Sequence, residues 1–543
     1  MLGIAHEYAN PALTYEHNCL KQMIQPRPSA IAILAASAIA AASFTSCKEQ
    51  ADNKLVILHT NDTHSQIEPG RDGLGGVMRR KAVIDSVRAA EKNVMVVDAG
   101  DAVQGTLYFY LYGGAVEQEV MNILGVDTRI LGNHEFDNGI DSLASVLKLS
   151  QAEKLASNYK LDNTPLKGMF KPYSIKEFGG KRIGFIGLNL DPDGIISKGN
   201  YDGLEFAPII ASANLLAEKL KTDDKVDAVI ALTHIGYNPS PLVGDSALAA
   251  NSRNIDIIIG GHSHDTIDPA TAKGATRSRM TNLDGKEVLV VQAGKAGRKL
   301  GKIEINLDSL GLGGRPKYEL INIDSRYDGY NDPALSSAIG KYSAGADSLM
   351  HLWVGSTDKK LDADNMELLN FFSDYIYDRG KELIGKVDLA IANKGGLRDG
   401  LPQGKFSKGH IINMVPFRNY ITVIDVKGSD LRGVFDVMAK TDGNGVSHNV
   451  EAVYDTIGGR TEYHATSVLI DGKPIDDSKT YRVATIDYLA NGGDYMKGLA
   501  RGAKVAVSQN AVFDDLLYYF TEGKGKDMPL KGSPENRWSI LKH

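Results

Sequence analysis

One polar stretch does most to set the architecture of this chain: Leu131-Gly132-Asn133-His134-Glu135-Phe136-Asp137-Asn138-Gly139. It follows a short apolar run, Thr128 to Leu131, and holds an amide, an imidazole and two carboxylates within a few residues. A change from apolar to small and polar residues is typical of an active-site loop behind a strand of an α/β sheet. Asn, Asp and Gly also form ordinary turns, so this stretch alone leaves both interpretations open.

The same pattern, an apolar strand followed by residues that bind metals, occurs four more times. Residues 55–58 lead to Asn61-Asp62-Thr63-His64, 94–97 to Asp98-Ala99-Gly100-Asp101, 228–232 to Thr233-His234, and 255–259 to Gly260-Gly261-His262-Ser263-His264. Ligands of α/β sheets bind at the carboxyl ends of the strands. We therefore expect these five loops to converge on one site.

The side chains of these loops suggest a metal site. The expected ligands are Asp62, His64, Asp101, Asn133, His234, His262 and His264. This mixture suits Zn, Mn, Fe, Co or Ni and is too rich in imidazole for calcium. Residues i and i+2 on extended backbone share a side, which would aim Asp62 with His64, and His262 with His264, into one pocket. Seven ligands exceed one tetrahedral site and suit two metals that share a carboxylate.

The charges of such a site favour phosphate chemistry. Two divalent ions bring more positive charge than the two carboxylates balance, and a metal pair about 3.5–4 Å apart serves in-line displacement at phosphorus. Asp137 follows His134 by three residues, and an Asp on one imidazole nitrogen fixes the tautomer and leaves the other nitrogen for substrate. Taken singly, each residue could be a core histidine, a helix cap or a turn residue. Their joint occurrence behind five strands favours the metal site.

Composition limits the other function classes. The 543 residues are 43% hydrophobic and 24% charged, with a net charge of −6, which is typical of a globular protein with at least two domains. No basic domain supports nucleic-acid binding. The two cysteines, Cys19 and Cys47, exclude a disulfide framework and thiolate-bound zinc. No apolar run of transmembrane length follows Cys47.

The beginning of the chain resembles a bacterial export signal. Met23 is a candidate start, Arg27 gives a basic region, and an apolar run of small residues extends from Ala30 to Ala42 before Ser43-Phe44-Thr45-Ser46-Cys47. We expect a lipoprotein with Cys47 acylated, exported to the periplasm or cell surface and anchored in the membrane. Phe44 stands where Leu is usual, and a plain signal peptide with an incidental cysteine is the alternative.

The rest of the sequence predicts a layered α/β first half and a second domain after it. Apolar strands are expected at 55–58, 94–98, 129–131, 182–188, 226–232, 255–259, 287–292 and 301–306, with helices at 75–90 and 140–155 between them. A helix over 332–350 would join the two halves. The second half is expected to hold a helix over 366–379 and strands near 388–392, 420–427 and 480–486.

These motifs resemble the 5′-nucleotidase family, from about Lys54 to the C-terminus. The resemblance implies a leader and tether over 1–53, a calcineurin-like metallophosphatase domain with a four-layer α/β sandwich over 54–330, a linker helix over 331–351, and a smaller α/β substrate-binding domain over 352–543. It implies one metal on Asp62, His64, Asp101 and His264 and another on Asp101, Asn133, His234 and His262. His134 and Asp137 match the catalytic dyad of the family. Some members carry Gln or Asn at the position of His264.

The C-terminal part resembles the family more loosely. Phe417 and Tyr488 match two rings that hold the nucleoside, and Asn393, Arg398 and Asp494 match substrate-contacting positions. Lys360 stands where a substrate-binding Arg is usual and lacks its bidentate geometry. The Glu expected before Asn365 is absent, and Tyr495 replaces a usual Gly.

The expected function is hydrolysis of nucleoside 5′-monophosphates to nucleoside and phosphate with two divalent metal ions, Zn, Mn, Co or Fe. The alternatives on the same site are a 2′,3′-cyclic nucleotide phosphodiesterase and a UDP-sugar or NAD pyrophosphatase. A surface protein that binds nucleotides without turnover is the alternative from another class, and the intact ligand set and dyad argue against it. The expected partner is a small nucleotide and not a nucleic acid, and the sequence leaves the oligomeric state open.

Overall fold

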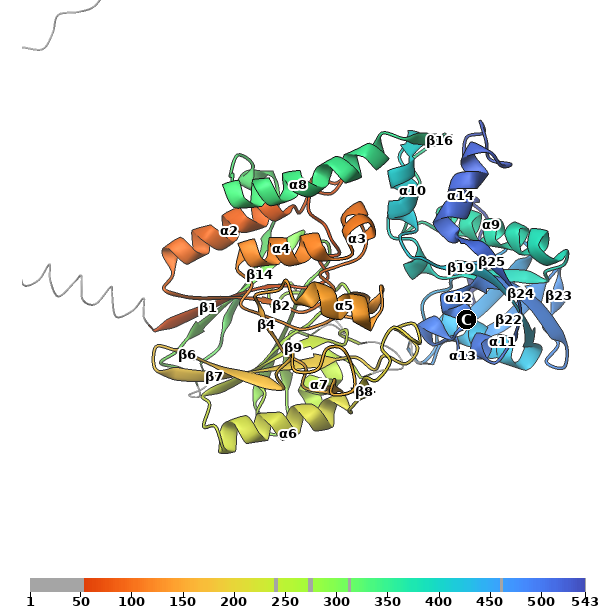
Figure 1. The fold of residues 1–543 in the computed structure, drawn as a ribbon. Helices are drawn as coiled ribbons and strands as arrows, with labels where there is room; N and C mark the ends of the chain where they lie inside the picture. The colour runs from red at the N-terminus through yellow and green to blue at the C-terminus, as the bar shows by residue number, and fades with distance from the viewer. Residues whose placement is uncertain (1–52, 239–242, 272–276, 311–313, 460–461, 543) are drawn as a thin grey trace, which may run out of the picture. The chain divides into compact units, whose positions relative to one another are not determined.

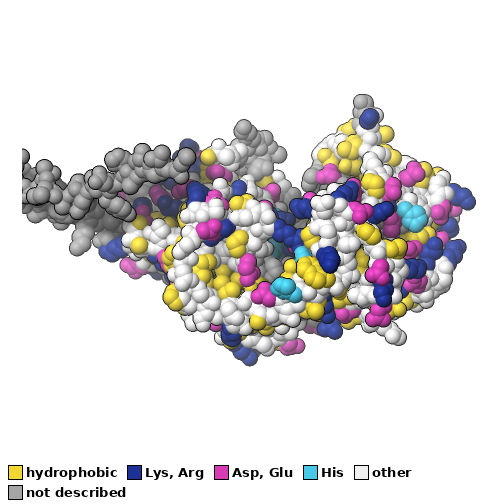
Figure 2. All heavy atoms as spheres, turned by 90° about the horizontal axis from the view of Figure 1, so that it is seen from above, with side chains coloured by type: hydrophobic (Ala, Val, Ile, Leu, Met, Phe, Trp, Pro, Cys, Tyr) yellow, Lys and Arg dark blue, Asp and Glu magenta, His cyan; other side chains and the backbone are white. Residues whose placement is uncertain are grey.

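The computed structural model describes residues 53–238, 243–271, 277–310, 314–459 and 462–542 (Figure 1). Residues 53–543 form one compact unit, which is described here by itself. The predicted leader and Cys47 lie outside the described residues. In the part of the chain that is described, no helix has both the length and the apolar character to cross a membrane. Acidic and basic side chains are interspersed on the face drawn in Figure 2.

The first sheet of the N-terminal half has the strand order β15-β14-β1-β2-β3-β4. Its strands β1 to β4 run parallel, β14 pairs antiparallel with β1, and β15 pairs antiparallel with β14. The bounds are β1 Lys54–Thr60, β2 Asn93–Asp98, β3 Thr128–Arg129, β4 Glu153–Lys154, β14 Lys299–Asn306 and β15 Lys317–Asn322.

The second sheet has the order β11-β13-β10-β9-β7-β6, with β12 beside β13. Its core of β7, β9, β10 and β13 is parallel. The bounds are β6 Tyr173–Phe178, β7 Lys181–Asn189, β9 Ala228–His234, β10 Ile257–Ile259, β11 Thr266–Ile267, β12 Arg279–Thr281 and β13 Glu287–Ala293, and a separate pair is formed by β5 Tyr159–Lys160 and β8 Glu205–Phe206.

The two sheets pack face to face between two layers of helices, as the alternation along β1 shows. Leu55 and Ile57 belong to the core shared with the second sheet, whereas Val56 and Leu58 pack toward helices. Strands that are buried on both faces need apolar side chains at every position, which explains the unbroken runs in the sequence. The first sheet is covered by α2 Val77–Ala90, α3 Leu107–Tyr112, α4 Ala115–Leu124 and α8 Pro333–Met350, and the second by α6 Ile209–Thr222 and α7 Asp245–Asn251 (Figure 1). The predicted four-layer α/β sandwich is confirmed.

Helix α8 leads from this sandwich into the C-terminal half. Asp332 caps its start by accepting a hydrogen bond from the Leu335 backbone N–H, and Pro333 occupies the first helical position. The C-terminal half has its own core around the sheet β20-β17-β24-β19-β25 and a second sheet β23-β22-β21-β26. Two domains of mixed α/β structure are therefore present, as predicted.

The elements of the C-terminal half have the following bounds. The helices are α9 Met366–Ile384, α10 Lys408–Met414, α11 Gly428–Ala439, α12 Asp487–Ala490, α13 Lys497–Ala500 and α14 Val512–Thr521. The strands are β16 Trp353–Thr357, β17 Leu389–Ala392, β18 Gly404–Ser407, β19 Tyr420–Lys427, β20 Gly445–Val446, β21 Val450–Asp455, β22 His464–Ile470, β23 Lys473–Pro474, β24 Thr480–Ile486, β25 Ala503–Ala511 and β26 Trp538–Ile540.

Two predicted helices have different ends in the structure. The helix expected over 140–155 is α5 Ile140–Leu147, because its apolar face stops at Leu147 and Leu149 is 53% exposed. Residues 153–154 instead pair with β3 as the edge strand β4. Helix α9 continues past 379 to Ile384, where Gly385 takes a positive φ of 82° and ends it.

Candidate metal centre

The predicted ligands follow the carboxyl ends of strands from both sheets. In the first sheet Thr60 of β1 lies beside Asp98 of β2, and Asp98 lies beside Arg129 of β3, so these three strands end at one level. In the second sheet His234 ends β9, and the loop with His262 and His264 follows β10. The parallel register therefore brings loops that are far apart in the sequence to one edge.

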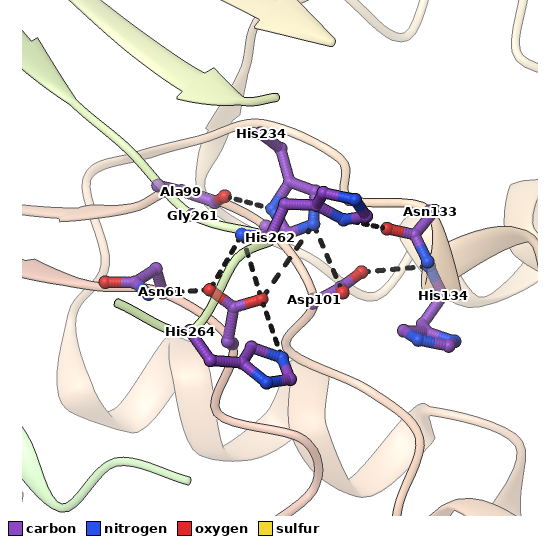
Figure 3. A network of polar contacts seen from close by, with 12 residues as sticks. Asn61, Ala99, Asp101, Asn133, His134, His234, Gly261, His262 and His264 are labelled. Atoms are coloured by element: carbon purple, nitrogen blue, oxygen red, sulfur yellow. Dashed lines mark hydrogen bonds and ion pairs between the residues drawn. The ribbon is translucent and has the colours of Figure 1, made fainter. Parts of the chain in front are cut away.

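The structure gathers six of the seven side chains into two groups that could each hold a metal ion (Figure 3). The first group is Asp62, His64 and His264, and the second is Asp101, His234 and His262. In the first, the Nε2 atoms of His64 and His264 are 3.0 Å apart, and His264 Nε2 lies 3.5 Å from Asp62 Oδ1. In the second, His234 Nε2 lies 3.1 Å from Asp101 Oδ2.

The seventh predicted ligand, Asn133, lies at the second group. Its Oδ1 atom is 2.9 Å from His262 Nδ1 (Figure 3). Asp62 connects the two groups, because its Oδ1 atom also lies 3.9 Å from His234 Nε2. The two groups are thus neighbouring parts of one centre.

The backbone at these ligands is not extended, so the expected geometry of Asp62 with His64 and of His262 with His264 is wrong. Asp62, His64, Asp101, His262 and His264 all have positive φ, between 47° and 77°. Non-glycine residues rarely adopt this left-handed region, and each costs on the order of 1–3 kcal/mol unless its surroundings hold it. Here backbone bonds hold it, such as Asp62 N–H to Gly100 O at 2.9 Å and His64 N–H to Asp101 O at 3.1 Å. The turns, and not a shared strand face, aim the side chains inward.

Backbone carbonyls set the orientation of two imidazoles. His234 Nδ1 lies 2.7 Å from Ala99 O, and His64 Nδ1 lies 3.3 Å from Val103 O. A carbonyl partner keeps the proton on Nδ1 and leaves Nε2 as a metal ligand. His234 Nε2 is buried and faces two carboxylates, with Asp101 Oδ2 at 3.1 Å and Asp62 Oδ1 at 3.9 Å. A cation between these side chains would satisfy that atom, so the donor set fits a metal ion.

The protonation of the histidines agrees with that fit. Burial lowers the pKa of His262 to about 3 and holds the pKa values of His64 and His264 well below their usual range, so all three imidazoles are neutral as ligands must be. His234 differs: burial lowers its pKa, but the carboxylates of Asp101 and Asp62 outweigh burial and raise it to about 10. This corner of the site favours a positive charge, which a divalent cation would supply.

A histidine–aspartate pair stands beside the second group. His134 Nδ1 lies 2.9 Å from Asp137 Oδ2. The backbone N–H of His134 donates to Asp101 Oδ1 at 2.8 Å (Figure 3). Burial alone would lower the pKa of His134, but the carboxylates of Asp137 and Asp101 raise it. The pair is partly open, with side-chain exposures of 17% and 24%. The imidazole can therefore reach a ligand with its second nitrogen.

Sequence reasoning missed a buried ion pair that ties the loops together. Glu135 accepts hydrogen bonds from the backbone N–H groups of Asp101, Ala102 and Gly132 at 3.1, 3.0 and 2.7 Å. Arg129 Nη2 lies 3.0 Å from the same carboxylate, and both side chains are 1% exposed. The available signal was an arginine inside an apolar strand, six residues before a glutamate.

Asn61 is a second positioning residue without a predicted role. Its amide donates to Asp62 Oδ2 at 2.6 Å and to Gly294 O at 2.7 Å, and it accepts from Ala293 N–H at 2.9 Å. It therefore joins the loop behind β1 to the loop behind β13. Only its place directly before Asp62 hinted at this.

The second domain brings two predicted substrate residues to the centre. Arg398 Nη2 lies 3.2 Å from both ring nitrogens of His64. The ring of Phe417 lies 5.8 Å from that of His134 and 5.8 Å from the Arg398 guanidinium carbon. An arginine and an aromatic ring thus stand next to the metal ligands.

Three further predicted residues form a connected group. Asp494 accepts hydrogen bonds from Asn393 Nδ2 at 2.7 Å and from the Tyr488 hydroxyl at 2.8 Å. Lys360 is not part of it: its ammonium group lies 2.6 Å from Asp362, and its side chain is 61% exposed. The structure therefore gathers five of the six predicted substrate residues in two adjoining groups and places Lys360 elsewhere.

Comparisons with known proteins agree in both halves of the chain. A family model described as calcineurin-like phosphoesterase matches residues 55–266, and one described as 5′-nucleotidase, C-terminal domain, matches residues 348–501. The human 5′-nucleotidase is 28% identical over 488 residues, which cover 81% of this chain and 83% of that protein. The trifunctional nucleotide phosphoesterase protein YfkN of Bacillus subtilis (strain 168) is 27% identical over 491 residues, 81% of this chain, and this chain spans only 32% of its length.

A solved structure shows the same arrangement. The crystal structure of a 5′-nucleotidase precursor from Thermus thermophilus matches with a TM-score of 0.80 and 28% sequence identity, over 90% of this chain and 100% of that chain. The likeness thus includes both domains.

Proposed function

Since the chain belongs to the 5′-nucleotidase family and is a metallophosphoesterase, we propose that it hydrolyses nucleoside 5′-monophosphates to nucleoside and phosphate. One observation carries the proposal. Two groups of metal-type ligands lie at one sheet edge, and an arginine and an aromatic ring of the second domain lie next to them.

The proposed metal ligands follow from the two groups. Asp62, His64 and His264 would hold one divalent ion, and His234, His262 and Asn133 the other, with Asp101 shared. Neighbouring divalent ions neutralise phosphate charge and lower the pKa of water. The donor set suits Zn, Mn, Co or Fe and does not choose among them.

His134 and Asp137 are the proposed catalytic dyad, and Arg398 is a proposed substrate-binding residue. In the reaction water adds to phosphorus, the bond from phosphorus to the 5′ oxygen breaks, and that oxygen takes up a proton. Asp137 holds Nδ1 of His134, which leaves Nε2 to donate a hydrogen bond or a proton to the ester. The guanidinium of Arg398 would bind the phosphate oxygens through charge-assisted hydrogen bonds.

Phe417, Tyr488, Asn393 and Asp494 are the proposed nucleoside contacts. A Cβ at Gly493 would lie 2.5–2.6 Å from atoms of the Tyr488 ring, so that glycine packs closely against the ring. Asn393 and Asp494 offer polar atoms for ribose hydroxyls. The contact of Lys360 with substrate stays a prediction from the sequence. In the structure its ammonium group is paired with Asp362.

Chelation with a substrate panel tests the function. Purified protein should lose turnover with EDTA and regain it with Mn, Zn or Co. It should then hydrolyse AMP and other nucleoside monophosphates faster than 2′,3′-cyclic nucleotides, UDP-sugars or NAD. Full activity without detectable metal would refute the metal centre, and a preference for cyclic or pyrophosphate substrates would replace the nucleotidase assignment.

The aromatic contacts have a separate test. Stacking contributes roughly 1–3 kcal/mol per base, so Phe417→Ala and Tyr488→Ala should each lower kcat/KM for AMP about 10–100-fold. Turnover of p-nitrophenyl phosphate, which has no base, should change little. Folded variants that hydrolyse AMP as well as the parent would remove the nucleoside assignment.

The domain division and the membrane anchor remain proposals from the sequence. We propose a phosphatase domain over 54–330, a linker helix over 331–351 and a substrate-binding domain over 352–543. We also propose that Cys47 is acylated and that the exported protein is held at a membrane. Cys47→Ser should then release the protein from the detergent phase, and an unmodified mature N-terminus elsewhere than Cys47 would contradict the anchor.

A further inference from the structure

A lysine that the sequence motifs did not single out lies on the rim of the metal centre. Lys295 belongs to the loop behind β13, which is fixed on both sides of it. Before it, the Asn61 side chain bonds to Ala293 N–H at 2.9 Å and to Gly294 O at 2.7 Å. After it, Ala296 N–H donates to the backbone oxygen of Asp62 at 2.7 Å. Lys295 is therefore held to the loop that carries the first metal group.

The charge of Lys295 acts on the metal centre. It lowers the pKa of His264. Among the charges that act on Lys295, the Asp364 carboxylate raises its pKa most, the Arg398 guanidinium lowers it by repulsion, and Asp62 raises it. Partial burial lowers the pKa of the Lys295 ammonium group, although the residue remains exposed to solvent. A second cation thus stands beside Arg398 at the open side of the site.

Three other cations form ion pairs with carboxylates at close distance, whereas Lys295 is attracted by the Asp364 carboxylate without forming such a pair. Lys360 is paired with Asp362 at 2.6 Å, Lys359 with Glu367 at 2.7 Å, and Arg298 with Asp72 at 2.9 Å. Within the described residues, the ammonium group of Lys295 has no hydrogen bond and no ion pair. Two cations that repel each other beside a metal centre are stabilised when an anion binds between them.

We propose that Lys295 is a phosphate-binding residue of the phosphatase domain and that, with Arg398, it holds the non-bridging oxygens of the bound phosphate. The proposal rests on the proposed hydrolysis of phosphate esters. It assigns to Lys295 the substrate-binding role that the sequence suggested for Lys360. Because the loop of Lys295 is tied to Asn61 and Asp62, the lysine stays with the metal ligands and serves every phosphate ester, with or without a nucleoside.

The test compares Lys295→Met with Lys359→Met, which removes an equal charge from an exposed lysine paired with Glu367. Charge-assisted hydrogen bonds are worth enough that Lys295→Met should lower kcat/KM about 10–100-fold for both AMP and p-nitrophenyl phosphate. Inorganic phosphate should inhibit it about 10-fold more weakly, and calorimetric titration of metal-loaded protein with phosphate should show the same loss. Lys359→Met should match the parent, and metal content should be equal in all three proteins.

Several outcomes would overturn the proposal. Unchanged phosphate affinity and unchanged kcat/KM in Lys295→Met would remove Lys295 from the site. Loss of a metal ion in that variant would make the lysine a structural support of the metal loop. A defect in Lys360→Met without one in Lys295→Met would return the role to Lys360. If the parent hydrolyses p-nitrophenyl phosphate and no nucleotide, the proposed nucleotidase function fails, whereas the Lys295 test still stands on the small ester and on phosphate.

Discussion

Among single residues, His134 is the proposed proton donor of the centre. Its imidazole is held by Asp137 at 2.9 Å, and the raised pKa favours a proton for transfer to the leaving oxygen. We predict that His134→Ala lowers kcat about 10²–10⁴-fold while the metal content stays constant, because no proposed ligand is removed.

The control for this prediction is His448→Ala. His448 also faces an aspartate, with Nδ1 3.3 Å from Asp374 Oδ1, but its side chain is 57% exposed and it lies outside the centre. Its removal should leave kcat unchanged. Loss of one metal ion per chain in His134→Ala would make His134 a ligand and contradict the assigned role.

The buried ion pair of Glu135 and Arg129 is expected to stabilise the fold. Glu135→Gln keeps the shape of the side chain and leaves the Arg129 charge without a partner in a fully buried place. Breaking a buried pair in this way costs about 3–5 kcal/mol. Urea unfolding with EDTA present should show that loss, independently of metal binding. The exposed Glu177→Gln should stay within about 0.5 kcal/mol of the parent, and an equal result for Glu135→Gln would contradict the role of the pair.

Strand β4, at the edge of the first sheet, carries a glutamate that forms ion pairs with two lysines. Glu153 of β4 is 2.6 Å from Lys171 and 2.8 Å from Lys176. Burial raises its pKa, but the hydrogen bonds from the two lysines outweigh burial and lower it from 4.5 to about 2. A carboxylate with a lowered pKa in the folded state adds stability above its ordinary pKa, and that stability is lost as the pH falls toward the lowered value.

We therefore predict that Glu153→Gln lowers Tm by about 2 °C at pH 7 and that the difference shrinks between about pH 5 and about pH 2. Differential scanning calorimetry of parent and variant over that range checks it. Glu205→Gln removes a pair with Lys160 in which both side chains are more than half exposed, at 58% and 68%, and should change Tm little at any pH. A Tm difference that is constant with pH would assign the effect of Glu153→Gln to packing instead of charge.

The segment behind β7 links the two domains of the molecule. Tyr495, which stands where the family usually has Gly, has a positive φ of 60°, and a Cβ at Gly194 would lie 3.0 Å from its ring. The Tyr488 hydroxyl oxygen lies 3.3 Å from Ile195 O, and Lys497 pairs with Asp193 at 3.0 Å. The proposed nucleoside contacts thus rest on a loop of the phosphatase domain.

At this scale we predict that Gly194→Ala raises KM for AMP about 3–10-fold, because the new methyl group pushes Tyr495 and its neighbours away from that loop. Gly199→Ala is the matched control. Both glycines have positive φ, 88° and 93°, so both variants carry a similar backbone strain of about 1–2 kcal/mol, but nothing lies within 4 Å of a Cβ at Gly199. Equal KM values in the two variants would show that the contact does not position the nucleoside site.

The candidate metal ligands and the layered fold follow from local patterns along the chain. Apolar runs such as 55–58 are typical of strands buried on both faces, and the residues directly behind them are set at one edge by parallel pairing. His134 and Asp137 are three residues apart, so their contact is local as well. These features need no knowledge of distant contacts, which is why the sequence could predict them.

The directions of the side chains required the tertiary structure. Positive φ at Asp62 and His262 depends on bonds to loops of other strands, and a pattern of residue types does not encode that backbone geometry. The approach of Lys295 depends on Asn61, 232 residues away from Ala293, and Lys360 is turned aside by its neighbour Asp362. Which cations can face the proposed phosphate site is decided by such competing contacts, because a charged side chain goes to the partner that the folded backbone places within its reach.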